Sequence, residues 1–234
     1  MTPIFIIGMP RSGTKLLREI LNQHENISIP RAETGFIPYF VRRRSRYGNL
    51  KNGKNFHKLY VELTQTNFWN YMEQSKEIWG ESEVYDLAAS HTFADTIEAF
   101  YKAHARFEGK CIWGDKTPDY IYHTPLLKSL FPKARFVHII RDARDFCLST
   151  RNAWNKSICR AAQKWVNGIE KVRKDRSACT DYYELRYEDL IYDPALETRK
   201  LCEWLGVQYD SSMVNLRRSI ENIGDAREKI GILR

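Results

Sequence analysis

The sequence predicts an α/β fold: a central parallel sheet flanked by helices in three layers, with a helical insertion over the ligand face. Residues 3–7 form a short apolar run rich in β-branched side chains, which is typical of a buried strand. A loop with two glycines follows at residues 8–13, and the apolar spacing of residues 17–21 indicates an amphipathic helix. Residues 134–140 are largely apolar, as expected of a central parallel strand covered on both faces.

Length and composition fit one domain. With 234 residues, 43% of them hydrophobic, the chain can bury a substantial core, so we expect a single domain over residues 1–234. No apolar run approaches the roughly 18 residues of a membrane span. The first strand begins almost at the N-terminus and leaves no room for a secretory leader, so we expect a cytoplasmic protein unless a leader has been trimmed.

Charge and cysteine content narrow the classes of partner. The net charge of +8, from 37 Lys and Arg against 29 Asp and Glu, favours acidic partners, and a polyanionic nucleotide or a nucleic acid would both fit. The five cysteines are widely spaced and form no C-x-x-C pair or His/Cys cluster. This pattern indicates reduced thiols and no metal site.

The loop after the first strand is typical of a phosphate cradle, because backbone N–H groups and the helix dipole both favour an anion there. Gly8 and Gly13 fit the pattern G-x-x-x-x-G-K-[ST] of a magnesium–triphosphate site, but Thr14 takes the lysine's place and Lys15 follows. The register therefore favours a site in which Arg11 supplies the main positive charge. A βα turn without a ligand remains the alternative.

Two further strands are followed by charged residues. Glu33 comes shortly after a short strand at 27–29, and Lys116 follows a strand at 111–113. In a doubly wound sheet such residues lie on the ligand face, where Glu33 could act as a base and Lys116 could reach the cleft. From position alone, a carboxylate at a helix start and a surface lysine are the better interpretations.

The segment at about 41–107 is expected to be the helical insertion. Residues 41–56 are basic and turn-rich, which is typical of a solvated loop; the alternative is a lip that attracts an anionic acceptor. Residues 56–107 are polar and aromatic and end with helical spacing.

Arg141 and Ser149 follow the central strand, at its tip and two helical turns later. A guanidinium gives bidentate recognition of a phosphate and a hydroxyl adds a hydrogen bond, so both could face one phosphate. Alternatively, Arg141 forms an ion pair with Asp142 or Asp145. A basic helix at 156–176 follows.

A strand and a turn are expected at 182–190, and they contain Tyr187. An amphipathic helix then ends at Gly206, its expected C-cap.

These segments, in this order, resemble the sulfotransferases that use 3′-phosphoadenosine-5′-phosphosulfate (PAPS), above all the tyrosylprotein and related bacterial enzymes. P-R-S-G-T-K-L-L-R is similar to their 5′-phosphosulfate-binding loop, and Glu33-Thr34 falls on their Glu-Thr pair. D-K-x-P, R-D-A-R-D-x-x-x-S and R-Y-E-D-L match three later segments, with Ala143 replacing a common proline. The resemblance covers most of residues 3–210 and leaves the insertion unmatched.

The resemblance implies a P-loop-NTPase-like fold and a role for each matched residue. It implies that Glu33 is the general base and that Lys116 approaches the bridging oxygen of the donor, with Arg11 also catalytic. The donor-binding residues that it implies are Arg11, Ser12, Gly13, Thr14, Lys15, Arg141, Ser149, Tyr187, Arg227 and Lys229.

On this resemblance we expect a PAPS-dependent sulfotransferase that moves a sulfuryl group to a hydroxyl, or an amine, by in-line displacement without a metal. The product would be 3′-phosphoadenosine-5′-phosphate (PAP). The acceptor class stays open among small molecules, sugars and peptide tyrosines; no nucleic-acid or membrane partner is expected, and a homodimer is compatible with the sequence. The alternatives are a P-loop kinase or NTPase that uses ATP and magnesium, and a non-catalytic polyanion-binding protein.

Overall fold

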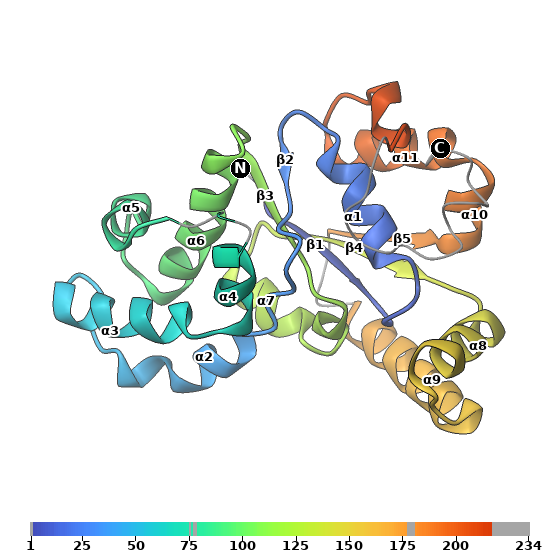
Figure 1. Ribbon diagram of the computed structural model, residues 1–234, viewed down its shortest axis with the longest axis horizontal. Coiled ribbons are helices and arrows are strands. Elements are labelled where there is room, and N and C mark those ends of the chain that lie inside the picture. Colours follow the sequence, from blue (N-terminus) through green and yellow to red (C-terminus); the bar gives the residue numbers. More distant parts are fainter. Residues whose placement is uncertain (1, 75, 77–78, 177–180, 217–234) are drawn as a thin grey trace. The chain divides into compact units, whose positions relative to one another are not determined.

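The computed structural model describes residues 2–74, 76, 79–176 and 181–216. These residues group into two compact units (Figure 1). The insertion unit comprises Asn26–Lys116 with the first residues of the chain, and the loop unit comprises Ile4–Glu25 with the described residues from Thr117 onward.

The loop unit is built on three parallel strands: β1 (Ile4–Gly8), β4 (Arg135–Ile140) and β5 (Tyr182–Arg186). β4 lies between the other two, with Phe136 opposite both Phe5 and Tyr182. All residues of β1 are buried, and so is the middle of β4. The apolar runs that predicted β1 and β4 are therefore explained by burial on both faces, whereas β5 buries only Leu185.

Helices follow each strand of the loop unit, as an α/β fold requires. α1 buries its apolar face through Leu16, Leu17, Ile20 and Leu21, and α8 and α9 lie side by side (Figure 1). The helices are α1 (Thr14–Asn22), α7 (Thr124–Leu130), α8 (Ala143–Trp154), α9 (Ile158–Asp175), α10 (Tyr187–Tyr192) and α11 (Pro194–Leu205), with 3₁₀ turns η2 (Pro118–Tyr122) and η4 (Ser211–Val214).

The insertion unit contains the parallel pair β2 (Ile27–Ser28) and β3 (Ile112–Lys116) and a run of helices. The helices are α2 (Ile37–Arg43), α3 (Gly53–Thr64), α4 (Asn67–Gln74), α5 (Glu81–Leu87) and α6 (Phe93–Phe107), with the 3₁₀ turn η1 (Arg44–Arg46). The helical character expected of this segment is thus present. The basic stretch is less loop-like than expected, because it holds the end of α2, all of η1 and the start of α3.

The local signals explain several element ends. The hydroxyl of Thr92 accepts a hydrogen bond from Asp95 N and caps α6, and Gly206 ends α11 in the left-handed conformation at φ 64°. Pro118 begins η2 one residue after β3, at a first helical position that suits its fixed φ and its missing N–H group. In the described part of the chain, no helix combines the length and the apolar character that a membrane crossing needs.

Candidate functional site

The loop between β1 and α1 is held in an unusual backbone conformation. Arg11 has φ 74°, and Gly13 has φ 94° and ψ 11° and forms the N-cap of α1. A Cβ atom at Gly13 would lie 2.4 Å from Cδ2 of Tyr187. Position 13 therefore requires glycine for two reasons, its left-handed backbone and the ring packed against it.

The loop and the start of α1 have the properties of an anion site. The first turn of α1 carries no acidic residue, so its exposed N–H groups and dipole are not neutralised from within the helix. Ser12 is 1% exposed, and its Oγ atom has no hydrogen-bond partner among the described residues. A buried hydroxyl of this kind is costly unless a ligand or water pairs with it.

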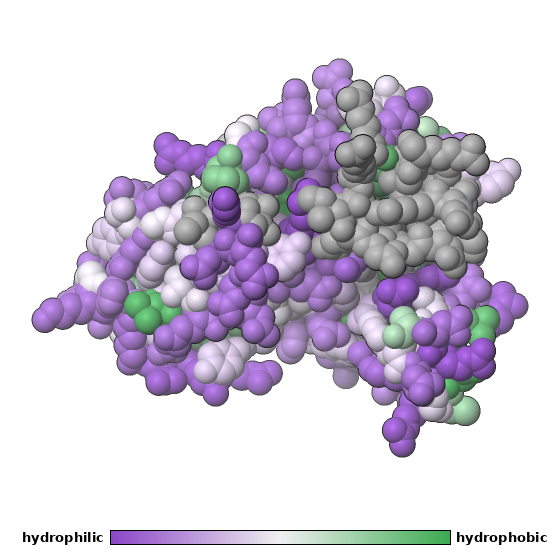
Figure 2. Space-filling model, viewed as in Figure 1, coloured by the Kyte–Doolittle hydropathy of each residue, from purple (hydrophilic) through white to green (hydrophobic). Residues whose placement is uncertain are grey.

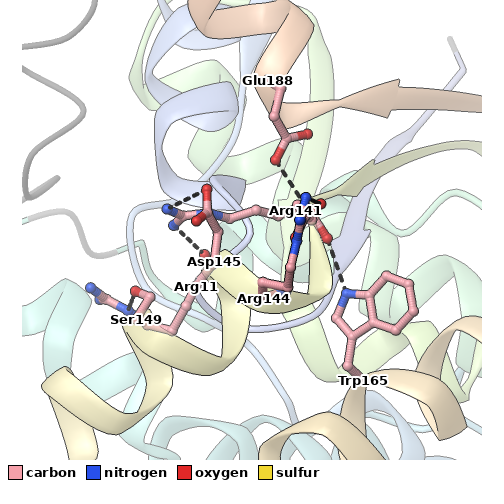
Figure 3. A network of polar contacts seen from close by, with 8 residues as sticks. Arg11, Arg141, Arg144, Asp145, Ser149, Trp165 and Glu188 are labelled. Carbon is pink, nitrogen blue, oxygen red and sulfur yellow. Dashed lines mark hydrogen bonds and ion pairs between the residues drawn. The ribbon is translucent and has the colours of Figure 1, made fainter.

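Arg11, Ser149 and Arg141 come together beside this loop (Figure 3). Arg11 Nε donates to Ser149 Oγ on α8 at 3.3 Å, and Arg141 Nη1 donates to the carbonyl oxygen of Arg11 at 3.1 Å. The Arg141 guanidinium lies 4.7 Å from the ring centre of Tyr187 and 3.9 Å from Asp145. Its buried Nε is left without a partner within the described residues, so Arg141 retains a donor for a ligand.

The backbone around Arg141 is fixed from two sides (Figure 3). Trp165 Nε1 on α9 donates to the carbonyl oxygen of Arg141 at 3.1 Å, and Asp142 N donates to Glu188 Oε1 at 2.9 Å. Asp142 caps α8 by accepting from Arg144 N at 2.8 Å. Hydrogen bonds from Arg144 hold the pKa of Asp142 well below its usual range. The anionic cap therefore persists at neutral pH and keeps Arg141 in place.

The insertion unit carries a separate polar pair. Lys116 Nζ at the end of β3 donates to Glu33 Oε1 at 2.5 Å. The Lys116 side chain is fully buried, whereas the Glu33 side chain is 48% exposed. The Glu33 carboxylate is thus exposed to solvent, and the buried Lys116 ammonium group orients it.

A second set of contacts joins the residues next to this pair. Thr34 Oγ1 donates to Asp115 Oδ2 at 2.5 Å, and Tyr101 OH on α6 donates to the same oxygen at 2.7 Å. The Tyr101 ring stacks on Trp113 at 4.5 Å between centroids. Asp115 is 1% exposed, so these hydroxyls neutralise part of the cost of burying its carboxyl group. Positions 33–34 are therefore fixed to positions 115–116 by two neighbouring contacts.

Sequence reasoning missed Tyr101 and the role of Asp115. Asp115 is the residue before Lys116 at the end of a buried strand, which is a usable signal. Tyr101 sits in the middle of a helix with apolar spacing, where a tyrosine is usually core. Only the fold shows that its hydroxyl reaches a carboxylate.

The remaining site residues expected from the sequence are distributed as follows. Thr14 and Lys15 form the first turn of α1, Thr14 buried and Lys15 exposed. Tyr187 is buried and opens α10 instead of ending a strand, so it contacts the loop through Gly13. Arg227 and Lys229 lie outside the described residues. Among the residues that the structure describes, no cluster of three His, Cys, Asp or Glu side chains could hold a metal ion.

Comparisons with known proteins show which proteins this chain is similar to. A family model described as "Sulfotransferase family" matches residues 3–211. Protein-tyrosine sulfotransferase A of Caenorhabditis elegans is 26% identical, with 91% of this chain and 52% of the relative covered. Protein-tyrosine sulfotransferase of Drosophila melanogaster is 28% identical, with 92% and 40% covered. The chain thus spans about half of these curated relatives or less.

Solved structures match over most of the chain. The sulfotransferase domain of the Synechococcus PCC 7002 olefin synthase is 24% identical with a TM-score of 0.64, covering 96% of this chain and 80% of that one. The sulfotransferase domain from the curacin biosynthetic pathway is 21% identical with a TM-score of 0.62, covering 93% and 78%. At these identities the matches confirm the α/β fold expected from the sequence.

Proposed function

Since this chain belongs to the sulfotransferase family, we propose that it transfers a sulfuryl group from PAPS to a hydroxyl acceptor and releases PAP. The observation that carries the proposal is the cluster of Arg11, Ser149 and Arg141 beside a glycine loop. Two guanidinium groups and a hydroxyl next to a helix N-terminus suit a nucleotide with two separate anionic ends. A single triphosphate on a displaced lysine would not need them.

We assign the loop to the 5′-phosphosulfate and Arg141 with Ser149 to the 3′-phosphate. The buried Ser12 hydroxyl and the buried Arg141 Nε support this assignment, because each is a polar atom that a phosphate oxygen could satisfy. Tyr187 packs against both Gly13 and Arg141 and would hold the two phosphate sites in register. The adenine role implied for Tyr187 remains compatible with that packing.

The chemical step is an in-line displacement at sulfur. Glu33 takes the proton of the acceptor hydroxyl, the acceptor oxygen forms a bond to sulfur, and the bond between sulfur and the 5′-phosphate oxygen breaks. Arg11, Lys116 and the loop N–H groups stabilise the charge that develops on the leaving phosphate. The support for Glu33 is its exposed carboxylate, which Lys116 orients. The class of the acceptor, a small molecule, a sugar or a peptide tyrosine, stays open in this proposal.

The test is transfer of ³⁵S from PAPS to a panel of alcohols, phenols and tyrosine peptides, compared between the wild type and Glu33→Gln. We expect the variant to lose about 10²–10⁴-fold in turnover, as removal of a general base does, while PAP affinity changes less than about twofold. Glu203→Gln on an exposed position of α11 is the matched control and should keep full activity. Near-normal turnover in Glu33→Gln would show that the base is another group.

A further inference from the structure

A cavity of about 390 Å³ opens between α8 and α9 and is bounded on one side by Pro10 of the loop. Its volume is in the range of small-molecule sites. Pro10 precedes Arg11, and α8 carries both Ser149 and the cavity residue Thr150. The cavity therefore shares its loop and one helix with the proposed nucleotide site, but none of the residues assigned to the nucleotide lines it.

The charged groups in this cavity are all positive. Lys156, Arg160 and Lys164 line it, and no Asp or Glu does. Within the described residues none of the three forms an ion pair, whereas Lys171 further along α9 pairs with Asp175. Lys156 instead lies 4.9 Å from the ring centre of Trp154. An anion would thus meet three cations that are not already neutralised.

Two of these charges, Arg160 and Lys164, are unfavourable for α9, which carries them. Arg160 stands in the first turn of α9, where no acidic residue balances it, and the helix dipole disfavours a cation there. Lys164 follows one turn later at the i,i+4 spacing, which is destabilising for like charges. A bound anion would remove both effects and would also satisfy the dipole, so the arrangement is stable with an anionic ligand in place.

A buried hydroxyl gives an independent indication of a ligand. Thr150 lines the cavity and is 3% exposed, yet its Oγ1 atom has no hydrogen-bond partner in the described part of the chain. Most buried hydroxyls are paired with protein or water. This one is available to a polar group that enters the cavity.

Most of the remaining lining is apolar, with Asn155 and Ser157 as the two polar residues. Phe146 and Ala161 are buried beneath it, and Trp154 is 45% exposed at its edge. Figure 2 shows hydrophobic residues among hydrophilic ones over α8 and α9, where Leu148, Ile158 and Val166 are also exposed. A ligand that fits would combine an apolar body with an anionic group.

We infer that this cavity binds the acceptor, and that the acceptor is a small molecule with an aromatic or aliphatic body and a carboxylate or phosphate group. The inference rests on the proposed sulfotransferase function, because only in a sulfotransferase would a molecule bound beside the loop accept the sulfuryl group. Arg160 and Lys164 hold the anionic group, Lys156 and Trp154 close over the body, and Thr150 bonds a polar atom of it.

The test measures binding rather than turnover. Calorimetric titrations are carried out with PAP at saturation, so that the nucleotide site is filled. The probes are 2-naphthyl phosphate, 2-naphthoate and 2-naphthol. Each probe is titrated into the wild type, into the cavity variant Arg160→Gln/Lys164→Gln and into the control variant Arg106→Gln/Lys133→Gln. The control removes one Arg and one Lys from exposed positions elsewhere. We expect the anionic probes to bind more tightly than 2-naphthol and to lose roughly 2- to 30-fold in the cavity variant only. The two anions together show which acidic group is preferred.

Three results would overturn the inference. The first is equal affinity for 2-naphthol and both anions, and the second is an equal loss of affinity for the anions in the two variants. The third is a Glu-rich peptide that, titrated in the same way, binds more tightly than every probe. Failure of the proposed function looks different. In that case a calorimetric titration of PAP alone into the wild type, carried out first, shows no binding.

Discussion

Gly13 is the residue on which the loop depends most, because its backbone and its lack of a side chain are both used. Gly13→Ala would force a Cβ into the Tyr187 ring, 2.4 Å away, at φ 94°. We expect it to lower the free energy of unfolding by more than the roughly 1–2 kcal/mol of left-handed backbone strain alone, and to abolish PAP binding. Urea unfolding and PAP titration measure the two effects.

Gly109→Ala separates strain from the clash. Gly109 has φ 69°, is exposed and has open space where a Cβ would stand. Gly109→Ala should lower the free energy of unfolding by only about 1–2 kcal/mol and leave PAP affinity unchanged. If Gly13→Ala were no more harmful than this control, the close packing of Tyr187 on the loop would be irrelevant to binding.

At this scale the sequence predicts residue types better than contacts. The spacing of Gly8, Gly13 and Arg11 is enough to predict an anion-binding loop, because the required backbone conformations are local. The carbonyl of Arg11 as a partner of Arg141 is a contact between residues 130 positions apart in sequence, and no local pattern encodes it. Roles for Arg11, Glu33 and Lys116 in catalysis stay predictions.

At the scale of elements, α6 fixes the end of β3 through the hydrogen bond from Tyr101 to Asp115. Tyr101→Phe removes one of the hydroxyls that pair with the buried Asp115 carboxyl group. We expect about 1–3 kcal/mol lower stability, the usual cost of leaving a buried polar group with fewer partners. Because Asp115 and Thr34 adjoin Lys116 and Glu33, kcat should also fall while PAP affinity is kept.

Tyr60→Phe is the matched control for this tyrosine. Tyr60 also belongs to a helix of the insertion unit and stacks on an aromatic ring, but its hydroxyl donates to the neutral carbonyl oxygen of Trp79. It should cost about 0.5–1.5 kcal/mol and leave kcat unchanged. An equal fall of kcat in both variants would mean that Tyr101 acts through general stability and has no positioning role.

Element boundaries were predictable where a strong local signal exists. Gly206 at the end of α11 is such a signal and acts as expected. The boundary between β5 and α10 was not, because Tyr187 has a high strand propensity yet begins the helix. Its burial against Gly13 overrides that propensity, and this is a tertiary effect.

At the scale of the whole molecule, the reactivity of each cysteine measures how well the fold protects it from solvent. Cys111 and Cys159 are exposed, and Cys147 and Cys202 are buried. Burial raises the pKa of Cys202 to about 11, and it also raises the pKa of Cys147. At pH 8 the Cys202 thiol therefore stays protonated, whereas an ordinary thiol with a pKa of about 8.5 is partly thiolate.

We therefore expect iodoacetamide at pH 8 to label Cys111 and Cys159 at least roughly 100-fold faster than Cys202 in the native protein. In urea the rates should converge. Mass spectrometry of tryptic peptides gives each rate separately. Fast labelling of Cys202 in the native protein would show that α11 opens readily and that Cys202 is not firmly packed.

The overall fold was predictable because parallel strands buried on both faces leave continuous apolar runs in the sequence. The insertion was harder, since its helices at 53–107 follow no matched motif and bury aromatic residues such as Trp69 and Trp79 in a core of their own. The cavity between α8 and α9 could not be foreseen, because it depends on how two helices pack.

The central claim is that Arg141 binds the 3′-phosphate of an adenine nucleotide whose other end lies on the loop. The most direct measurement is the ratio of affinities for PAP and 5′-AMP, which lacks that phosphate, in the wild type and in Arg141→Ala. The ratio cancels any effect of the lost Arg141–Arg11 contact on the loop itself. We expect PAP to bind roughly 10- to 100-fold more tightly in the wild type and the two to bind about equally in the variant. A ratio unchanged by the substitution would contradict the claim.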